Sequence, residues 1–168
     1  VPLESAEEHA RRRAALTGGG YPITTALDTP LNASFTRYAR LPALRWEGEE
    51  WTYTEVERIT GALAGGLQQA GVAPGDVVGT VLDRGPWQVW SRLALARCGA
   101  VELPLDPDAP LQRINQTLSD ARATTVLCTD PQRHTFPEDV TVHRPELLSG
   151  NFQPPSDLGP ASPLIMIY

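Results

Sequence analysis

Lysine is absent from the sequence, and all 14 basic residues are arginines. The chain can therefore supply neither a Gly-Lys-(Ser/Thr) phosphate loop nor a Schiff base. Acidic residues outnumber basic ones and give a net charge of −6, which argues against a nucleic-acid partner. The run Arg11-Arg12-Arg13 lies among glutamates, which indicates one face of a helix rather than a basic patch.

Long apolar runs and metal-binding patterns are also missing. No run approaches the ~18 to 20 residues of a membrane span, and the acidic first residues do not resemble a secretory signal. His9, His134 and His143 are scattered, without the spacing of a metal site. Cys98 and Cys128 lie in apolar surroundings, so we expect two reduced core thiols in a cytoplasmic protein.

What the sequence does contain is an alternation of amphipathic helices and short apolar strands. Residues 5–16 are expected to form a helix, which ends at three glycines and is followed by a linker up to Pro30. A second helix is expected over 31–40, and then a hairpin with strands 43–46 and 50–53. We therefore divide the chain into an N-terminal helix and linker, 1–30, and a domain, 31–168.

The clearest helical pattern follows the hairpin. Thr54 and Glu57 have the spacing of a capping box, which predicts the start of a helix there. Apolar residues then recur every three or four positions, and Gly71 is expected to end the helix in the left-handed conformation. The residues of this predicted buried stripe are Val56, Ile59, Leu63, Leu67 and Ala70.

Strands and helices continue to alternate after Gly71. Strands are predicted at 77–82, 101–103, 124–128 and 140–143, and further helices start near Pro86 and Asp108. Trp87, Trp90, Leu93 and Ala94 have helical spacing, which favours core packing over an aromatic ligand site. The order predicts an α/β fold, layered, with a largely parallel sheet and flanking helices. Ligands of such folds bind at the carboxyl ends of the strands.

The last residues, 164–168, form an apolar strand pattern with no turn or cap after it. A finished domain rarely stops inside such a strand, because an unpaired apolar edge promotes aggregation. The only methionine is Met166, so Val1 does not look like a translation start. We expect that both ends of the sequence were cut from a longer polypeptide.

Four spaced motifs resemble the adenylate-forming superfamily, and within it the amino-acid adenylation domains of nonribosomal peptide synthetases. Trp-Thr-Tyr-Thr-Glu-Val at 51–56 is similar to the first family motif, and Gly-Val-Ala-Pro-Gly-Asp at 71–76 also resembles the family. Arg-Cys-Gly-Ala-Val-Glu-Leu-Pro-Leu-Asp at 97–106 is similar to the second motif. Its continuation through Pro107, Pro110, Arg113 and Ile114 favours the peptide-synthetase branch.

The second motif departs from the family pattern at three positions. Arg97 stands where the family has lysine, Cys98 where it has alanine, and Glu102 where it has an aromatic residue. A glutamate in a short central strand is unusual, and we expect it to face solvent or a neighbouring subunit.

The residues of these motifs are best explained as structural. Gly99 is expected to let a helix end tightly against a strand, and Pro104 to stop strand pairing. Asp106 and Asp108 are expected to cap the next helix, with Arg113 on its polar side, suited to an ion pair. A metal cluster of Glu102, Asp106 and Asp108 is the less favoured alternative. We therefore assign no catalytic, cofactor-binding or metal-binding residue.

The resemblance implies a function for the whole enzyme. It would use ATP and Mg²⁺ to convert an amino acid into an aminoacyl-adenylate, and transfer the acyl group to the phosphopantetheine thiol of a carrier protein. The partners it implies are the rest of the adenylation domain, the carrier protein, an upstream condensation domain and an MbtH-like accessory protein. The family's phosphate loop would follow residue 168, so we expect these 168 residues alone to be inactive.

Two alternatives remain open at this point. One is an acyl-CoA or fatty-acyl-AMP ligase of the same superfamily. The other is a non-catalytic, truncated adenylation domain that acts by association with other proteins.

Overall fold

A four-stranded parallel sheet forms the centre of the structure, a computed structural model that describes residues 28–168 except 157, 160 and 168. The strand order is β4-β3-β5-β6. The strands are β3 (Val77–Val81), β4 (Val101–Leu105), β5 (Thr125–Cys128) and β6 (Thr141–His143). All three neighbouring pairs are parallel, which confirms the predicted fold class.

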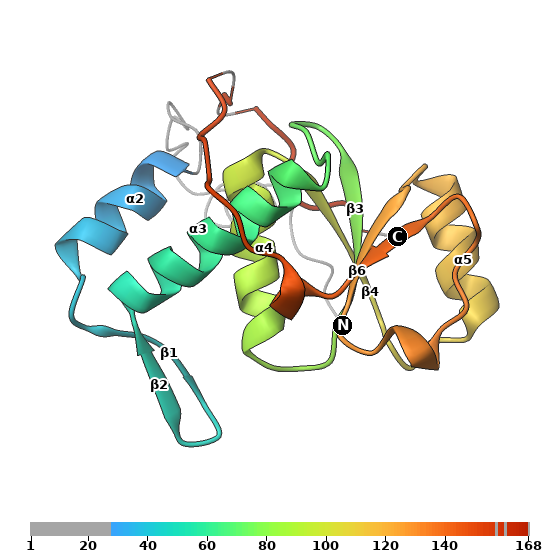
Figure 1. Ribbon diagram of the computed structural model, residues 1–168, viewed down its shortest axis with the longest axis horizontal. Coiled ribbons are helices and arrows are strands. Elements are labelled where there is room, and N and C mark those ends of the chain that lie inside the picture. The colour runs from blue at the N-terminus through green and yellow to red at the C-terminus, as the bar shows by residue number, and fades with distance from the viewer. Residues whose placement is uncertain (1–27, 157, 160, 168) are drawn as a thin grey trace, which may run out of the picture.

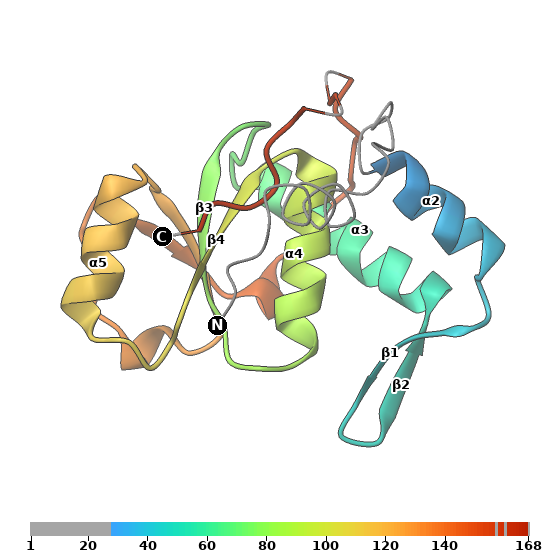
Figure 2. The ribbon, with the colours of Figure 1, turned by 180° about the vertical axis from the view of Figure 1, so that it is seen from behind.

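Helices cover both faces of this sheet (Figures 1 and 2). On one side lie α3 (Tyr53–Gln69) and α4 (Pro86–Cys98), and on the other lies α5 (Leu111–Asp120). Two short 3₁₀ helices follow β5 and β6, namely η1 (Pro131–Arg133) and η2 (Pro145–Leu147). The predicted helix at 5–16 and most of the linker after it lie outside the described residues.

The strands are apolar on both faces because each face has its own helix layer. Val78 and Leu127 pack with Leu63 and Leu95 of the α3–α4 layer. On the opposite face, the strands and α5 form a second buried cluster. The buried residues of that cluster are Val81, Leu103, Ile114, Leu118, Ala123, Val126 and Cys128.

The segment before the sheet consists of α2 (Asp28–Arg37) and the antiparallel hairpin of β1 (Pro42–Trp46) and β2 (Glu49–Thr52). The hairpin projects from the start of α3 (Figure 1). Its turn places Glu47 and Gly48 at positive φ, as a tight hairpin turn requires. The predicted hairpin is confirmed, whereas the helix before it starts and ends about three residues earlier than predicted.

The start of α3 differs from the prediction. Thr52, not Thr54, is the N-cap, and its partner in the capping box is Glu55. The hydroxyl of Thr54 instead donates to the carbonyl of Ala39 at 3.0 Å. The reason is that pairing of β2 with β1 ends at Thr52, which leaves Thr52 as the last extended residue before the helix.

Two glycines end helices as predicted. Gly71 has φ +94° one residue beyond the C-cap of α3, and Gly99 has φ +74° at the C-cap of α4. Two other glycines have a role that the sequence pattern did not predict. A Cβ on Gly65 would lie 2.3 Å from the backbone of Gly150, and one on Gly66 would lie 2.6 Å from Ser149 N. The chain after η2 therefore crosses α3 in direct backbone contact.

The predicted strand 164–168 is wrong in its extent. Within the described residues, only Ile165 pairs with the sheet, through one parallel bridge to Glu102 on the outer edge of β4. Ile167 is 85% exposed. Pro104 was predicted to stop strand pairing. This is wrong on the side of β4 that faces β3, because Pro104 pairs there with Thr80.

Candidate functional site

The connections between strands place a candidate site at one edge of the sheet. The chain passes from β3 through α4 to β4 on one side, and from β4 through α5 to β5 on the other. The strand order therefore reverses beside β3, and ligands of open α/β sheets bind outside the carboxyl ends of the strands at such a point. Asp83 follows β3 there, Asp106 and Asp108 follow β4, and Arg133 ends the 3₁₀ helix after β5.

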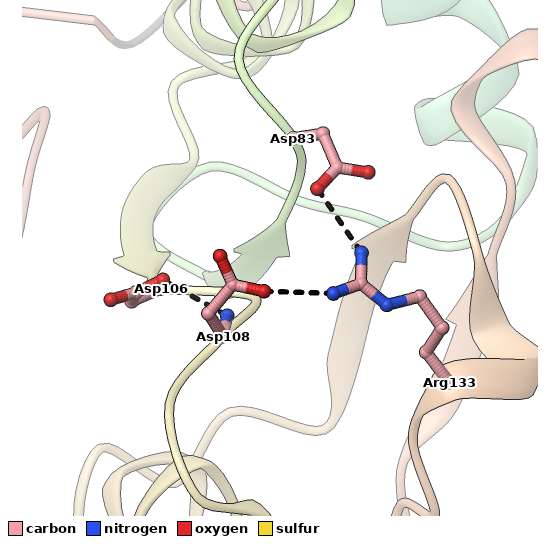
Figure 3. Close-up of polar contacts among 4 residues, drawn as sticks. All are labelled: Asp83, Asp106, Asp108 and Arg133. Atoms are coloured by element: carbon pink, nitrogen blue, oxygen red, sulfur yellow. Dashed lines mark hydrogen bonds and ion pairs between the residues drawn. The ribbon is translucent and has the colours of Figure 1, made fainter.

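Arg133 connects these loops (Figure 3). Its Nη1 lies 3.2 Å from Asp83 Oδ1, and its Nη2 lies 2.8 Å from Asp108 Oδ1. The hydrogen bond to Asp108 and the negative charge of Asp83 raise the pKa of the Arg133 guanidinium above its ordinary value. The three side chains are 42–80% exposed, so the network is in contact with solvent. We call it the carboxyl-edge network.

The predicted capping role of Asp106 and Asp108 is wrong. The N-cap of α5 is Pro110, and no side chain caps that helix. Asp106 Oδ1 instead accepts the backbone N–H of Asp108 at 2.9 Å, and Asp108 binds Arg133. Asp106 and Asp108 lie four and two residues before this N-cap, and their side chains have these other partners. Arg113 is exposed as predicted, but it forms no ion pair with any residue that the structure describes.

A surface groove of about 540 Å³ lies beside the carboxyl-edge network. Its lining residues come from the ends of β3 and β4 and from the start of α4: Leu82, Asp83, Arg84, Gln88, Pro104, Leu105, Asp106, Pro107 and Asp108. Three carboxylates against one arginine make this groove unsuitable for a triphosphate by charge alone.

The structure also separates the residues of the alternative metal cluster. Asp106 and Asp108 lie in the exposed loop after β4, whereas Glu102 is 1% exposed inside that strand. Among the described residues, no group of three or more His, Cys, Asp or Glu could hold a metal ion. The three residues therefore do not come together as a metal cluster, and we derive no catalytic step from them.

The expected location of Glu102 is wrong. The Glu102 side chain does not face solvent or another subunit. It is buried beneath α4, where its Oε2 lies 2.5 Å from Arg92 Nε. Thr80 of β3 donates to its Oε1 at 3.0 Å. A buried carboxylate needs such partners, because desolvation of an unpaired charge is costly.

Sequence reasoning missed both Arg92 and Arg133. A signal for Arg92 exists in retrospect: Glu102 sits in an apolar strand, and a buried carboxylate implies a counter-charge on the covering helix. Arg133 had no such signal, because its partners are 25 and 50 residues away and all are exposed.

Most of the predicted core residues and both thiols are confirmed, but Ala70 of the predicted buried stripe is exposed. Trp90 and Ala94 are buried, while Trp87 and Leu93 are partly buried against the same clusters. Both cysteines are free and buried. Burial raises the pKa of Cys98 to about 12, so its thiol is unsuited to be a nucleophile.

Comparison with known proteins agrees with this α/β architecture. Residues 31–159, more than half of the chain, match the family described as AMP-binding enzyme. The chain belongs to the AMP-binding enzyme family. No helix in the part of the chain that the structure describes is long and apolar enough to cross a membrane.

Nonribosomal peptide synthetases are among its relatives. The chain is 32% identical over 127 residues to the nonribosomal peptide synthetase vlms of Lecanicillium sp., a match that covers 75% of the chain and 1% of the synthetase. It is 42% identical over 77 residues to CymA, a probable non-canonical nonribosomal peptide synthetase of Salinispora arenicola, covering 46% of the chain and 1% of CymA. The chain thus spans a very small part of each of these proteins.

Solved structures share the fold. The N-terminal subdomain of Klebsiella oxytoca NpsA in complex with 3-hydroxybenzoyl-AMSN superposes with a TM-score of 0.76 at 24% identity, over 88% of this chain and 39% of that one. The nonribosomal peptide synthetase FmoA3 gives a TM-score of 0.78 at 27% identity, over 90% and 17% of the two chains. The chain therefore has the fold of the N-terminal part of an adenylation domain, as the motifs predicted.

Proposed function

We propose that this chain is the N-terminal segment of an adenylation domain in a nonribosomal peptide synthetase. The whole domain would activate the carboxylate of an amino acid with ATP and Mg²⁺ and release pyrophosphate. The observation that carries this proposal is the family match over residues 31–159, together with relatives that are peptide synthetases. The match also supports the proposed division of the chain near residue 31.

In this proposal the described residues serve as scaffold. They form the sheet, with β4 as its outer strand, and the two helix layers that cover it. The groups that bind ATP come from elsewhere in the domain. The activated acyl group would pass to a carrier-protein thiol in the cytoplasm. Support for a carrier-protein partner comes from NpsA-ThdA of Klebsiella oxytoca, an artificially fused adenylation and carrier-protein di-domain that shares this fold. The condensation domain and an MbtH-like protein are further proposed partners.

The test is amino-acid-dependent exchange of pyrophosphate into ATP, measured with the natural polypeptide that contains this chain. The substrate panel should hold the proteinogenic amino acids, aryl acids such as the anthranilyl and 3-hydroxybenzoyl groups bound to NpsA, and medium-chain fatty acids. We expect exchange with one amino acid or a small related group. Exchange with fatty acids alone would contradict the proposal and support the fatty-acyl ligase alternative.

The isolated 168 residues provide the matched control. We expect them to show no exchange above background, because in this proposal the groups that bind ATP lie elsewhere in the domain. Exchange by the isolated chain would show that the scaffold role is wrong.

A further inference from the structure

The buried Glu102 of β4 contacts both the neighbouring strand β3 and the covering helix α4. Each carboxylate oxygen of Glu102 is engaged: Oε2 by Arg92 Nε at 2.5 Å, and Oε1 by Thr80 Oγ1 at 3.0 Å and Arg92 Nη2 at 3.4 Å. Arg92 belongs to α4, and Thr80 belongs to β3. The side chain of Glu102 therefore fixes β4 to the neighbouring strand and to the covering helix.

The backbone of the same residue holds the C-terminal segment. Glu102 N–H donates to the carbonyl of Leu164 at 2.9 Å, and Met166 N–H donates to the carbonyl of Glu102 at 2.8 Å. These two bonds are the parallel bridge between Glu102 and Ile165. They set the register in which residues 164–166 lie along β4.

Pro104 limits this pairing to one bridge. Backbone groups of a strand alternate in direction, so Pro104 directs its nitrogen to the same outer edge as Glu102. Because proline has no N–H, it cannot donate to the C-terminal segment in the next register position. Thus Pro104 continues the ladder with β3 on its inner side but stops pairing on its outer side. The exposed Ile167 is consistent with this end of pairing.

Glu102 is also where this chain departs from the aromatic residue of the family motif. An aromatic side chain at this position could fill the space beneath α4, but it would make no directional bonds to Arg92 and Thr80. Directional bonds to a buried polar group specify one arrangement among several similar ones, and setting register is the best documented use of such groups. A slip by one residue would exchange the half-buried Leu164 and Met166 for the exposed Ile165.

We propose that Glu102, held by Arg92 and Thr80, is a positioning residue that fixes the register of residues 164–166 on the outer edge of β4. Together with Pro104, it determines where the following backbone leaves the sheet. Because the bridge is parallel, that backbone runs toward the carboxyl ends of the strands, where ligands of such sheets bind. In the adenylation domain proposed above, on which this step rests, Glu102 therefore acts on the reaction through the position of that backbone.

The experiment compares Glu102→Gln, Arg92→Met and Arg92→Lys in the natural polypeptide that contains this chain. Hydrogen–deuterium exchange of peptides covering residues 161–167 reports whether the Met166 N–H keeps its bond to the Glu102 carbonyl, and it needs no activity. Steady-state kinetics of pyrophosphate exchange, well below the melting temperature and normalised to folded protein, report the consequence. Glu50→Gln, which removes a carboxylate from the exposed Arg45–Glu50 pair on the hairpin, is the matched control.

We expect faster deuterium uptake at 161–167 in Glu102→Gln and Arg92→Met, and a fall of about tenfold in kcat, as expected for a small misplacement near reacting groups. Arg92→Lys should recover part of both effects because it restores the charge. Stability loss alone would change the folded fraction but not kcat per folded molecule. Glu50→Gln should leave both readouts unchanged.

Unchanged uptake at 161–167 in both Glu102→Gln and Arg92→Met would overturn the inference, as would changed uptake with unchanged kcat. Lack of exchange activity in the wild-type polypeptide is a different result, because it contradicts the proposed function before any variant is compared. In that case the uptake data still decide whether the Glu102 side chain holds the bridge to residues 164–166 in place.

Discussion

Two arginine–carboxylate groups lie on the same parallel sheet, one buried and one exposed. Beneath α4, Glu102 is 1% exposed and Arg92 is 42% exposed. At the carboxyl edge, Arg133 meets Asp83 and Asp108, which are 58% and 80% exposed. The distances are similar, since the shortest contacts are 2.5 Å in the buried pair and 2.8 Å in the edge network.

Geometry alone therefore does not tell what each group contributes. Water can solvate Asp83, Asp108 and Arg133 when the edge network opens, so each contact adds little to folding stability. Glu102 has no such alternative, because loss of Arg92 leaves a charge inside the sheet layer. The two groups thus differ mainly in the free energy that is lost when each is broken.

The largest effect is expected from Arg92→Met. Removal of one partner of a buried pair costs about 3–5 kcal/mol, and because Arg92 is partly exposed we expect about 2–3 kcal/mol. Denaturant unfolding of the natural polypeptide measures the change. The double variant Arg92→Met/Glu102→Leu should recover most of the loss, since it leaves no buried charge. A double variant as unstable as Arg92→Met would show that packing, not charge, is lost.

Gly99, the C-cap of α4, tests whether the layer around the buried Arg92–Glu102 pair also depends on close backbone contact. Its φ is +74°, and a Cβ would lie 2.2 Å from Leu158 Cδ2. We expect Gly99→Ala to cost about 1–2 kcal/mol, from the left-handed conformation and the contact with Leu158. Thermal unfolding measures it.

Gly71 is the matched control for Gly99. Its φ is +94°, but a Cβ at this position would meet no other atom within 4 Å. Gly71→Ala should therefore cost about 1 kcal/mol, from backbone strain alone. Equal losses at the two positions would show that Leu158 moves away without cost. Altered amino-acid preference with normal stability would instead identify Gly99 as part of a substrate site.

The sequence predicted the parts of this fold that depend on local pattern. The alternation of strands and helices follows from apolar periodicity, and Gly71 and Gly99 at helix ends follow from their tolerance of positive φ. The start of α3 was placed two residues late because Thr52–Glu55 and Thr54–Glu57 have the same capping spacing. Only the end of pairing between β1 and β2 decides between them.

Pairings across the sheet could not be predicted in the same way. Arg92 reaches Glu102 only because α4 crosses back over β3 and β4, and no local pattern encodes that crossing. To predict the limited pairing of residues 164–166, one must know which side of β4 they occupy, because Pro104 blocks pairing only on the outer side. The carboxyl-edge network brings together residues from three loops, which requires the strand order β4-β3-β5.

The capping box of α3 contains another exposed carboxylate, that of Glu55. Unlike the carboxylates that bind Arg133, it accepts a hydrogen bond from a backbone N–H, that of Thr52. Hydrogen bonds from the Thr52 backbone and hydroxyl lower the pKa of Glu55 below its ordinary value. A lowered folded-state pKa adds stability above the unfolded-state pKa, and this stability is lost as pH falls through the folded-state value. We expect Glu55→Gln to reduce the melting temperature slightly at pH 7 and to converge with wild type in acid. A constant difference at every pH would contradict this origin.

The smallest effect is expected from the carboxyl-edge network itself. Arg133→Met removes both contacts, to Asp83 and to Asp108, but all three side chains are solvated without them. We therefore expect no measurable change in melting temperature at physiological salt, and loss of any small difference from wild type at 1 M salt, where exposed charges are screened beyond about 3 Å. Arg144→Met is the control beside the same sheet, because it breaks the Arg144–Glu146 contact after β6, in which the two side chains are 50% and 25% exposed. If Arg133→Met is as destabilising as Arg92→Met, solvent exposure does not determine how much each arginine–carboxylate group contributes to stability. The three loops at the carboxyl edge would then depend on Arg133 for their fold.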